Sequence, residues 1–162
     1  MSYIDNMLLD LELPSGNLWC KYNFDSNVLD YNIKISTPED WYGSYYAYGE
    51  LETKKRYSDN NYKFISDNII TKYNNTDKLF ELEKCDDIVS ICTDGHLRIP
   101  SRKDFEELKE YTEFRWEENY QYVIGLNGEL FISKINGIEL FFPAGGVFGR
   151  NEIADAGKSA IY

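Results

Sequence analysis

The sequence is poor in the residues from which catalytic and metal sites are usually built. Its 162 residues include one histidine, His96, and three cysteines, Cys20, Cys85 and Cys92. An odd number of cysteines beside a single histidine fits neither a disulfide framework nor a Cys/His zinc site. We therefore expect three reduced and mostly buried thiols, which favours synthesis in a reducing compartment.

Positive charge and long apolar runs are scarce as well. Lys and Arg number 17 against 28 Asp and Glu, so the net charge of -11 repels phosphate backbones and anionic lipid headgroups. There is no apolar run of about 18 residues and no basic, apolar export signal at the start. We expect a soluble chain that is not marked for export, with no nucleic-acid and no membrane partner. The acidity does not identify a partner, because it also serves solubility.

Aromatic and aliphatic side chains are abundant. Hydrophobic residues make up 43% and aromatic residues 16%, with 14 tyrosines and 9 phenylalanines. This is too much apolar material for a disordered chain, and aromatic residues favour strands. A chain of this length forms one core, so residues 1–162 are expected to be a single domain.

The N-terminal half predicts mostly extended and irregular structure. Apolar residues alternate on both sides of a Pro-Ser-Gly-Asn turn, and a later polar stretch has no sustained period. The predicted elements are two short strands at Leu9–Leu13 and Leu18–Trp19, an extended region at Val28–Ile35, a turn at Pro38–Gly43 and a surface loop over 51–79. We expect that loop either to carry function or to be packed down by its own tyrosines.

Two helices are predicted. Asp86–Cys92 has acidic residues at its start, Thr93–Gly95 at its end, and a face of Ile88, Ile91 and Cys92. A longer helix follows Pro100. Its side chains are assigned as follows: Ser101 caps the first turn with Asp104; Phe105, Leu108 and Tyr111 or Thr112 face the core; Lys103, Glu106, Glu107, Lys109 and Glu110 face water.

After Trp116 the period changes from helical to alternating. Two Asn-Gly pairs are flanked by apolar residues, and such pairs favour hairpin turns because both turn positions need positive φ. We predict a three-stranded antiparallel meander of Tyr120–Leu126, Glu129–Ile135 and Ile138–Phe142, with turns at Asn127-Gly128 and Asn136-Gly137. Pro143–Gly146 ends the last strand.

No pattern typical of catalysis is present. A nucleophile with a base, a carboxylate pair in a cleft or a metal site is needed, and none is visible. His96 is interpreted as structural, and Gly145–Arg150 lacks the spacing and the lysine of a phosphate loop, so it is interpreted as a turn. The Asp86-Asp87 pair fits a helix N-terminus better than a calcium loop. We expect no catalytic residues, no metal and no cofactor.

The aromatic stretch at 41–48 allows two interpretations. Its rings can present stacking platforms for a sugar or a protein, or they can pack in a core or between subunits. Alternation places some of them inside, which favours packing. The residues concerned are Trp41, Tyr42, Tyr45, Tyr46 and Tyr48.

Four segments, in order, resemble one family. They are Leu11–Trp19, with a Leu-Pro-Ser-Gly turn before a tryptophan; Pro38–Asp40 with Tyr42–Glu50, an aromatic segment ending in Gly-Glu; Leu97–Leu108, an Arg-Ile-Pro-Ser turn leading into a Glu-Glu-Leu helix; and Ile138–Gly146, a strand ending in Pro-Ala-Gly. On these motifs, residues 9–146 resemble the Fibrobacter succinogenes major paralogous domain. The family has a tryptophan where this chain has His96-Leu97.

The resemblance implies an α+β, C-type-lectin-like fold with small antiparallel sheets and two helices. Its relatives include the formylglycine-generating enzymes, whose C-terminal cysteine pair is missing here, so no catalytic residue carries over. The family continues through a Tyr-Trp-Ser-Ser segment beyond Tyr162. We therefore expect the usual C-terminal part to be absent and 147–162 to be a tail or a truncated element. Binding residues are left unassigned, because the ligand loops usually lie in that part.

Family members occur in surface proteins of gut bacteria and in the virions of their phages. Since the domain begins near Met1 without an export signal, we expect a non-enzymatic module of a phage virion, made in the host cytoplasm: a head or tail fibre, decoration or host-adhesion protein. Expected partners are other copies of itself, other virion proteins, and a host-surface glycan or protein. The alternative is a bacterial cell-surface module that binds carbohydrate or protein.

Overall fold

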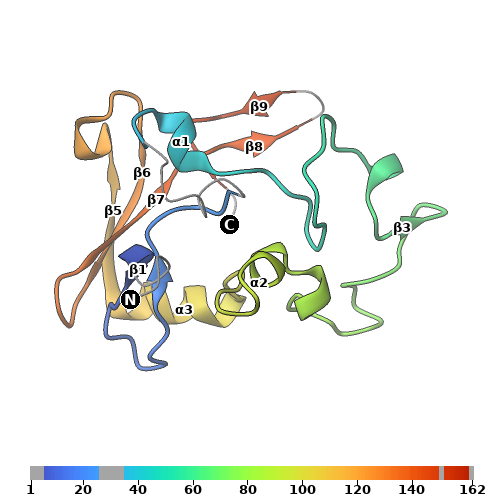
Figure 1. The fold of residues 1–162 in the computed structure, drawn as a ribbon, viewed down its shortest axis with the longest axis horizontal. Coiled ribbons are helices and arrows are strands. Elements are labelled where there is room, and N and C mark those ends of the chain that lie inside the picture. Colours follow the sequence, from blue (N-terminus) through green and yellow to red (C-terminus); the bar gives the residue numbers. More distant parts are fainter. Residues whose placement is uncertain (1–5, 26–34, 150–151, 161–162) are drawn as a thin grey trace. The chain divides into compact units, whose positions relative to one another are not determined.

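The computed structural model describes residues 6–25, 35–149 and 152–160 (Figure 1). It is a mixed α+β structure of small antiparallel sheets and short helices, as the sequence predicts. The chain divides into two compact units. Unit 1 contains the described parts of Met1–Ser44, Lys103–Val147 and Ala154–Tyr162, and unit 2 contains those of Tyr45–Arg102 and Phe148–Ile153. The expectation of one domain stays a prediction. None of the described helices is long and apolar enough to cross a membrane.

A three-stranded antiparallel sheet organises unit 1. Its strands are β5 (Thr112–Glu117), β6 (Gly128–Ser133) and β7 (Glu139–Pro143), in that order across the sheet. The predicted meander is confirmed, and its second and third strands lie close to where they were expected. The connection between β6 and β7 contains the predicted Asn136-Gly137 pair but is longer than a two-residue turn, because β6 already ends at Ser133. Gly137 has a φ of 73°, whereas Asn136 is not among the residues with positive φ.

The position predicted for the first strand is wrong. Tyr120–Leu126 forms a loop that contains the short 3-10 helix η4 (Tyr120–Tyr122), and the strand is β5, which directly follows a helix. Gly128 is therefore the first residue of β6 and not part of a hairpin turn. A Cβ atom there would lie 2.1 Å from the carbonyl oxygen of Phe142, so this glycine serves the close approach of β7.

The helix predicted after Pro100 is present as α3 (Arg102–Tyr111). Leu108 is fully buried and Phe105 and Tyr111 pack against the same cluster, which confirms the predicted core face. Thr112 follows the last helical residue as the first residue of β5. Its hydroxyl donates to the Leu108 carbonyl oxygen over 2.6 Å, so the helix passes into the strand without a connecting loop.

One side of the sheet packs against α3 and the N-terminal segment. The buried cluster consists of Leu11, Leu13, Trp19, Leu108, Phe131 and Leu140. Beside it, Trp19, Phe105 and Phe142 meet in a triad with ring centroids 5.5, 5.9 and 5.8 Å apart. These three rings come from the first, third and fourth of the segments that carry the family resemblance. The segments are separate in the sequence and share one core.

Two short strands precede this core, as expected. β1 (Leu8–Leu9) pairs antiparallel with β2 (Trp19–Cys20). The strand predicted at Leu9–Leu13 is confirmed only at Leu9, and the φ of 53° at Glu12 is not that of a strand residue. The extended region predicted over Val28–Ile35 lies, up to residue 34, outside the described residues.

The turn predicted at Pro38–Gly43 is wrong, because Pro38–Tyr42 forms helix α1. Proline at the first helical position has the right φ, and Asp40 Oδ2 accepts hydrogen bonds from the N–H groups of Ser36 and Thr37 over 2.9 and 2.7 Å. These bonds lower the pKa of Asp40. The described residues thus contain a third α-helix where two were expected.

The other side of the sheet carries the second buried cluster. Leu130 and Phe141 alternate with Phe131 and Leu140 along their strands, so they point to the opposite side. There they pack with Leu126 and with Trp41, the buried residue of α1. Apolar packing therefore covers both sides of β6 and β7, whereas most of β5 is exposed.

Unit 2 is formed mainly by turns. Its elements are η2 (Asp59–Asn61), the antiparallel pair β3 (Ile65–Ser66) and β4 (Ile69–Ile70), η3 (Lys84–Asp86) and α2 (Ile88–Cys92). The predicted loop over 51–79 is therefore interrupted by a hairpin. Its turn residues, Asp67 and Asn68, have φ values of 52° and 61°, and polar residues of this kind tolerate that conformation.

Helix α2 confirms the prediction for Asp86–Cys92, although its predicted face is wrong. Ile88, Val89 and Ser90 are buried, whereas Ile91 and Cys92 are exposed. A helix of five residues makes fewer than two turns, so residue spacing alone does not determine its buried side.

The residues after Gly146 include further short strands. β8 (Val147–Phe148) and β9 (Ile153–Ala154) form a two-stranded sheet. Within unit 1, the N–H group of Gly146 donates to the Ser159 carbonyl oxygen over 2.7 Å, and Gly146 forms a parallel bridge with Ala160. Pro143 ends β7, as predicted.

Candidate functional site

The loop between β5 and β6 in unit 1 combines an unusual backbone with exposed apolar side chains. We call residues 118–127 the 118–127 loop. Asn119, Gln121 and Tyr122 have φ values of 53°, 51° and 65°. The left-handed region costs a non-glycine residue roughly 1–2 kcal/mol, and such residues gather at functional sites. The strain makes this loop the leading candidate in unit 1.

Hydrogen bonds fix the backbone of this loop. The N–H group of Tyr120 donates to the Leu126 carbonyl oxygen over 2.8 Å. The Asn119 side chain accepts from the N–H group of Gly125 over 2.8 Å, and the N–H group of Asn119 donates to the Asn127 side chain over 3.1 Å. These bonds close the loop at its base, and they offset part of the backbone strain.

Aromatic packing anchors the loop to the sheet. The Tyr120 ring stacks on Phe141, with centroids 4.0 Å apart and planes inclined by 8°. Trp41 meets Tyr120 edge-on at 5.7 Å, and Leu126 is fully buried in the same cluster. Burial raises the pKa of Tyr120. The base of the loop is thus part of the core of unit 1.

The tip of the loop faces water. Tyr122 is 98% exposed and Ile124 is 88% exposed. An aromatic and an aliphatic side chain on a fixed backbone lose little conformational freedom when they bind, which favours their use as contacts. A tyrosine also offers a ring for stacking and a hydroxyl for a hydrogen bond. The loop tip thus offers apolar contact, ring stacking and one hydroxyl group.

Residue spacing did not predict this loop. Tyr120, Tyr122 and Ile124 alternate with other residues as in a strand, and that pattern led to the wrong prediction. The available signal was the pair of flanking residues, because Asn119 and Gly125 are types that tolerate positive φ.

Packing accounts for most of the aromatic stretch at 41–48. In unit 1, Trp41 is buried and Tyr42 packs against the same cluster. In unit 2, the Tyr45 carbonyl oxygen accepts a hydrogen bond from the Tyr57 hydroxyl, and the Tyr45 ring lies 5.7 Å from that of Phe148. Tyr46 is partly buried. Tyr48 is about half exposed, and its ring meets Tyr73 edge-on.

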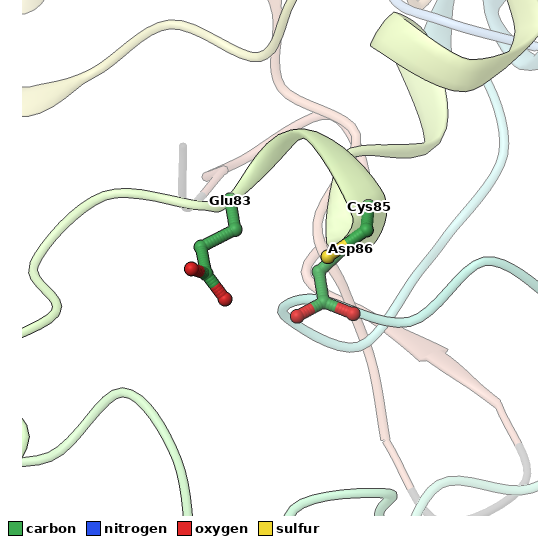
Figure 2. Close-up of side chains that lie close together, drawn as sticks. All are labelled: Glu83, Cys85 and Asp86. Carbon is green, nitrogen blue, oxygen red and sulfur yellow. The ribbon is translucent and has the colours of Figure 1, made fainter.

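A cluster of charged and polar side chains lies in unit 2, around η3. Figure 2 shows the side chains of Glu83, Cys85 and Asp86 close together, and their potential ligand atoms lie within 4.8 Å of one another. Asp86 is buried, and its carboxylate accepts hydrogen bonds from Lys63 over 2.7 Å, Lys72 over 2.6 Å and Tyr73 over 2.7 Å. Burial alone would raise the pKa of Asp86, but these bonds outweigh it and lower the pKa well below its usual range.

These contacts give Asp86 a structural explanation. Lys72 also pairs with Glu83 over 2.5 Å, and its pKa is raised by its bonds to Asp86 and Glu83. A metal ion at Glu83, Cys85 and Asp86 would have to displace two ammonium groups that already satisfy the buried carboxylate. The cluster instead joins two positions of the 51–79 segment, Lys63 and Lys72, to η3.

The neighbouring acid, Asp87, caps α2. Its carboxylate accepts from the N–H groups of Ser90 over 3.0 Å and Ile99 over 2.9 Å. The interpretation of this pair as helix N-terminal charge is therefore confirmed for Asp87, whereas Asp86 serves the lysine cluster. His96 is exposed, and its backbone N–H group donates to the Thr93 carbonyl oxygen in the turn that follows α2.

The expectation of mostly buried thiols is wrong. Cys85 and Cys92 are exposed and Cys20 is partly buried. Cys85 lies in η3, whose buried residue is Asp86, and Cys92 is the last residue of α2, whose buried residues are Ile88, Val89 and Ser90. Burial raises the pKa of the Cys20 thiol. The interpretation of Gly145–Arg150 as a turn is wrong, because Val147–Phe148 forms strand β8 and Gly146 forms a bridge with Ala160. Arg150 lies outside the described residues.

No protein-family model, no curated protein and no solved structure matches this chain. The resemblance to the Fibrobacter succinogenes major paralogous domain rests on the four sequence segments and stays a prediction.

Proposed function

We propose that this chain is a non-enzymatic structural or binding module of a phage virion, and that its 118–127 loop contacts the partner. The virion roles that fit are a head or tail fibre, a decoration protein or a host-adhesion protein. The observation that carries the binding role is the exposure of Tyr122 and Ile124 on a strained loop whose base is fixed by hydrogen bonds and ring stacking.

The virion role is supported by the family resemblance. Trp19, Phe105 and Phe142 come from three resembling segments and meet in one triad. Shared motif residues that form a core are what a common fold requires, so the triad supports a C-type-lectin-like fold of the Fibrobacter succinogenes major paralogous domain type. On this proposal the protein acts in the virion, with copies of itself, other virion proteins and a host-surface glycan or protein as partners.

The absence of catalysis is part of the proposal. The buried acids have structural partners. Asp86 binds two lysines and Asp87 caps α2. Glu50 accepts from the backbone N–H group of Lys63 and pairs with Lys54, and Asp104 accepts from the Asn17 side-chain amide. The loop offers an aromatic ring and an aliphatic side chain, which suit contact rather than bond making.

The location is tested by mass spectrometry of virions purified from the source culture. Peptides of this chain in stoichiometric amounts are expected. If the chain is absent from virions and present on bacterial envelopes, the virion role is wrong and the alternative of a bacterial surface module takes its place.

The binding site is tested with the double variant Tyr122→Ser, Ile124→Ser. Its matched control is Phe80→Ser in unit 2, since Phe80 is 73% exposed and also apolar. The labelled chain is incubated with host cells and with purified virions, and retention is measured. We expect the double variant to lose at least about tenfold in apparent affinity and the control to bind like the wild type. Equal binding by all three chains would exclude the loop as the contact.

A further inference from the structure

Strand β5 has the features of an unpaired sheet edge. Among the described residues it pairs only with β6, and Figure 1 shows it as an outer strand of its sheet. Its side chains alternate between Thr112, Phe114 and Trp116 on one side and Glu113, Arg115 and Glu117 on the other. Phe114 is 53% exposed and Trp116 is 48% exposed. An exposed edge with aromatic side chains is a template for pairing with another strand.

The hydrogen bonds to β6 show which backbone groups point outward. The N–H group of Lys134 donates to the Tyr111 carbonyl oxygen over 3.0 Å, in line with the β5–β6 register. Along an antiparallel strand, the backbone N–H and C=O groups of successive residues point alternately to one neighbour and the other. The backbone groups of Glu113 and Arg115, like those of Tyr111, therefore point toward β6. Those of Phe114 and Trp116 therefore face the free edge, where a further strand can pair with them.

Charge selects one register for a second copy of the same strand. If Phe114 lies opposite Phe114 of the second copy, Glu113 of each copy lies opposite Arg115 of the other. Sliding one strand by two residues one way places Arg115 opposite itself and Glu113 opposite Glu117. Sliding the strand by two residues in the other direction places Glu113 opposite Glu113 of the second copy. Like charges directly opposite destabilise a sheet, and opposite charges stabilise it.

A shift by a single residue is excluded by the backbone. It would place the outward groups of Phe114 against Arg115, whose own groups are used by β6. The register centred on Phe114 is thus the one that satisfies the backbone, the charges and the apolar side together. The second edge of the sheet is less suitable, because β7 contains Pro143, which has no N–H group to donate.

We propose that β5 is a self-association edge, at which two copies of this chain pair antiparallel about Phe114. The pairing joins two three-stranded sheets into one continuous sheet. It covers Phe114 and Trp116 on one side and aligns Glu113 with Arg115 of the second copy on the other. Arg115 is already oriented along the strand by its ion pair with Glu117 at 3.1 Å. The association is independent of what the 118–127 loop binds.

The test is light scattering over a concentration series with charge variants. The wild type is expected to reach twice the mass of one chain. Arg115→Glu and Glu113→Arg each place like charges opposite, so each is expected to raise the dimer dissociation constant by about tenfold or more. The double variant Glu113→Arg, Arg115→Glu restores opposite charges and is expected to restore the dimer. Lys103→Glu, an exposed change of the same size on α3, is expected to leave the dimer intact.

The register is tested by oxidative cross-linking in a chain that carries Cys85→Ser and Cys92→Ser. Phe114→Cys is expected to cross-link two copies, because opposite residues lie about 5.5 Å apart. Glu113→Cys is expected not to cross-link the two copies, because the Cα atoms of residue 113 in the two copies would lie more than about 7 Å apart. A wild-type chain that stays monomeric at every concentration, a dimer insensitive to Arg115→Glu, or cross-linking at 113 and not at 114 would each overturn the proposal.

Discussion

Tyr120 lies flat on Phe141, with ring centroids 4.0 Å apart and ring planes inclined by 8°. The contact joins the base of the 118–127 loop to β7. Two residues further along, Tyr122 is exposed at the tip of the same loop. One loop therefore contains a tyrosine that holds the fold and a tyrosine that is free to contact a partner.

The two tyrosines are expected to differ sharply in their effect on stability. Tyr120→Ala removes the stack and leaves a cavity beside Trp41, so the free energy of unfolding should fall by about 3 kcal/mol. Tyr122→Ala removes a side chain that the fold does not bury, so the change should stay within about 0.5 kcal/mol. Urea unfolding followed by tryptophan fluorescence measures both. Equal losses in the two variants would show that the loop tip is part of the core.

Gly128 is expected to tolerate no side chain. A Cβ atom there would lie 2.1 Å from the Phe142 carbonyl oxygen and 2.7 Å from the Phe141 ring, so Gly128→Ala must separate β6 from β7. We expect a loss of about 2 kcal/mol or more in thermal or urea unfolding.

The control for this variant is Gly149→Ala. A Cβ atom at Gly149 would make an ordinary contact of 3.7 Å with the Glu152 carbonyl oxygen, and Gly149 is not among the positive-φ glycines. Gly149→Ala should change the free energy of unfolding by no more than about 0.5 kcal/mol. If Gly128→Ala is equally silent, the two strands are further apart than described.

Periodicity and helix-start signals predicted much of unit 1. The helix after Pro100 and the strand pair around Asn136-Gly137 follow from local rules, in which residue spacing and turn chemistry agree. The first strand was misplaced because Tyr120–Leu126 alternates as a strand does. Tertiary contacts overrule that pattern, since Tyr120 is needed on Phe141 and Leu126 in the core.

The candidate site depends on what local rules do not contain. That Tyr122 is exposed and Tyr120 is partly buried follows from which side of the loop meets Trp41, a residue 79 positions before Tyr120 in the sequence. The Asp86 cluster is similar, because its lysines come from the polar stretch that has no period of its own. Contacts between residues this far apart in the sequence cannot be predicted from the residue spacing of a single sequence.

The three cysteines are expected to react at different rates. Cys85 and Cys92 are exposed, whereas Cys20 is partly buried and burial raises the pKa of its thiol. The thiolate is the reactive form, so Cys20 should be labelled by iodoacetamide at least about tenfold more slowly at neutral pH. Mass spectrometry of the labelled peptides over time gives the three rates. Unfolding the chain in urea is the control, and it should bring the rates together.

The Asp86 cluster predicts a loss of stability in acid. Hydrogen bonds from Lys63, Lys72 and Tyr73 outweigh the effect of burial and hold the pKa of Asp86 below its value in the unfolded chain, which is about 3.9. The unfolded chain therefore binds more protons in acid, and stability falls with pH. The contribution is fully present well above about pH 4, and it is lost as the pH falls from there through the folded pKa.

Urea unfolding of the wild type and of Asp86→Asn at a series of pH values measures this contribution. Asp86→Asn should be less stable at neutral pH, because Lys63 loses its charged partner and Lys72 keeps only Glu83. The difference should shrink steadily below about pH 4. Asp67→Asn, a change at an exposed carboxylate in the β3–β4 turn, is the matched control and should follow the wild type. A constant difference between the wild type and Asp86→Asn down to the lowest pH would mean that the carboxylate is not held in its charged form. The lysine cluster would then contribute nothing to the fold through its charge.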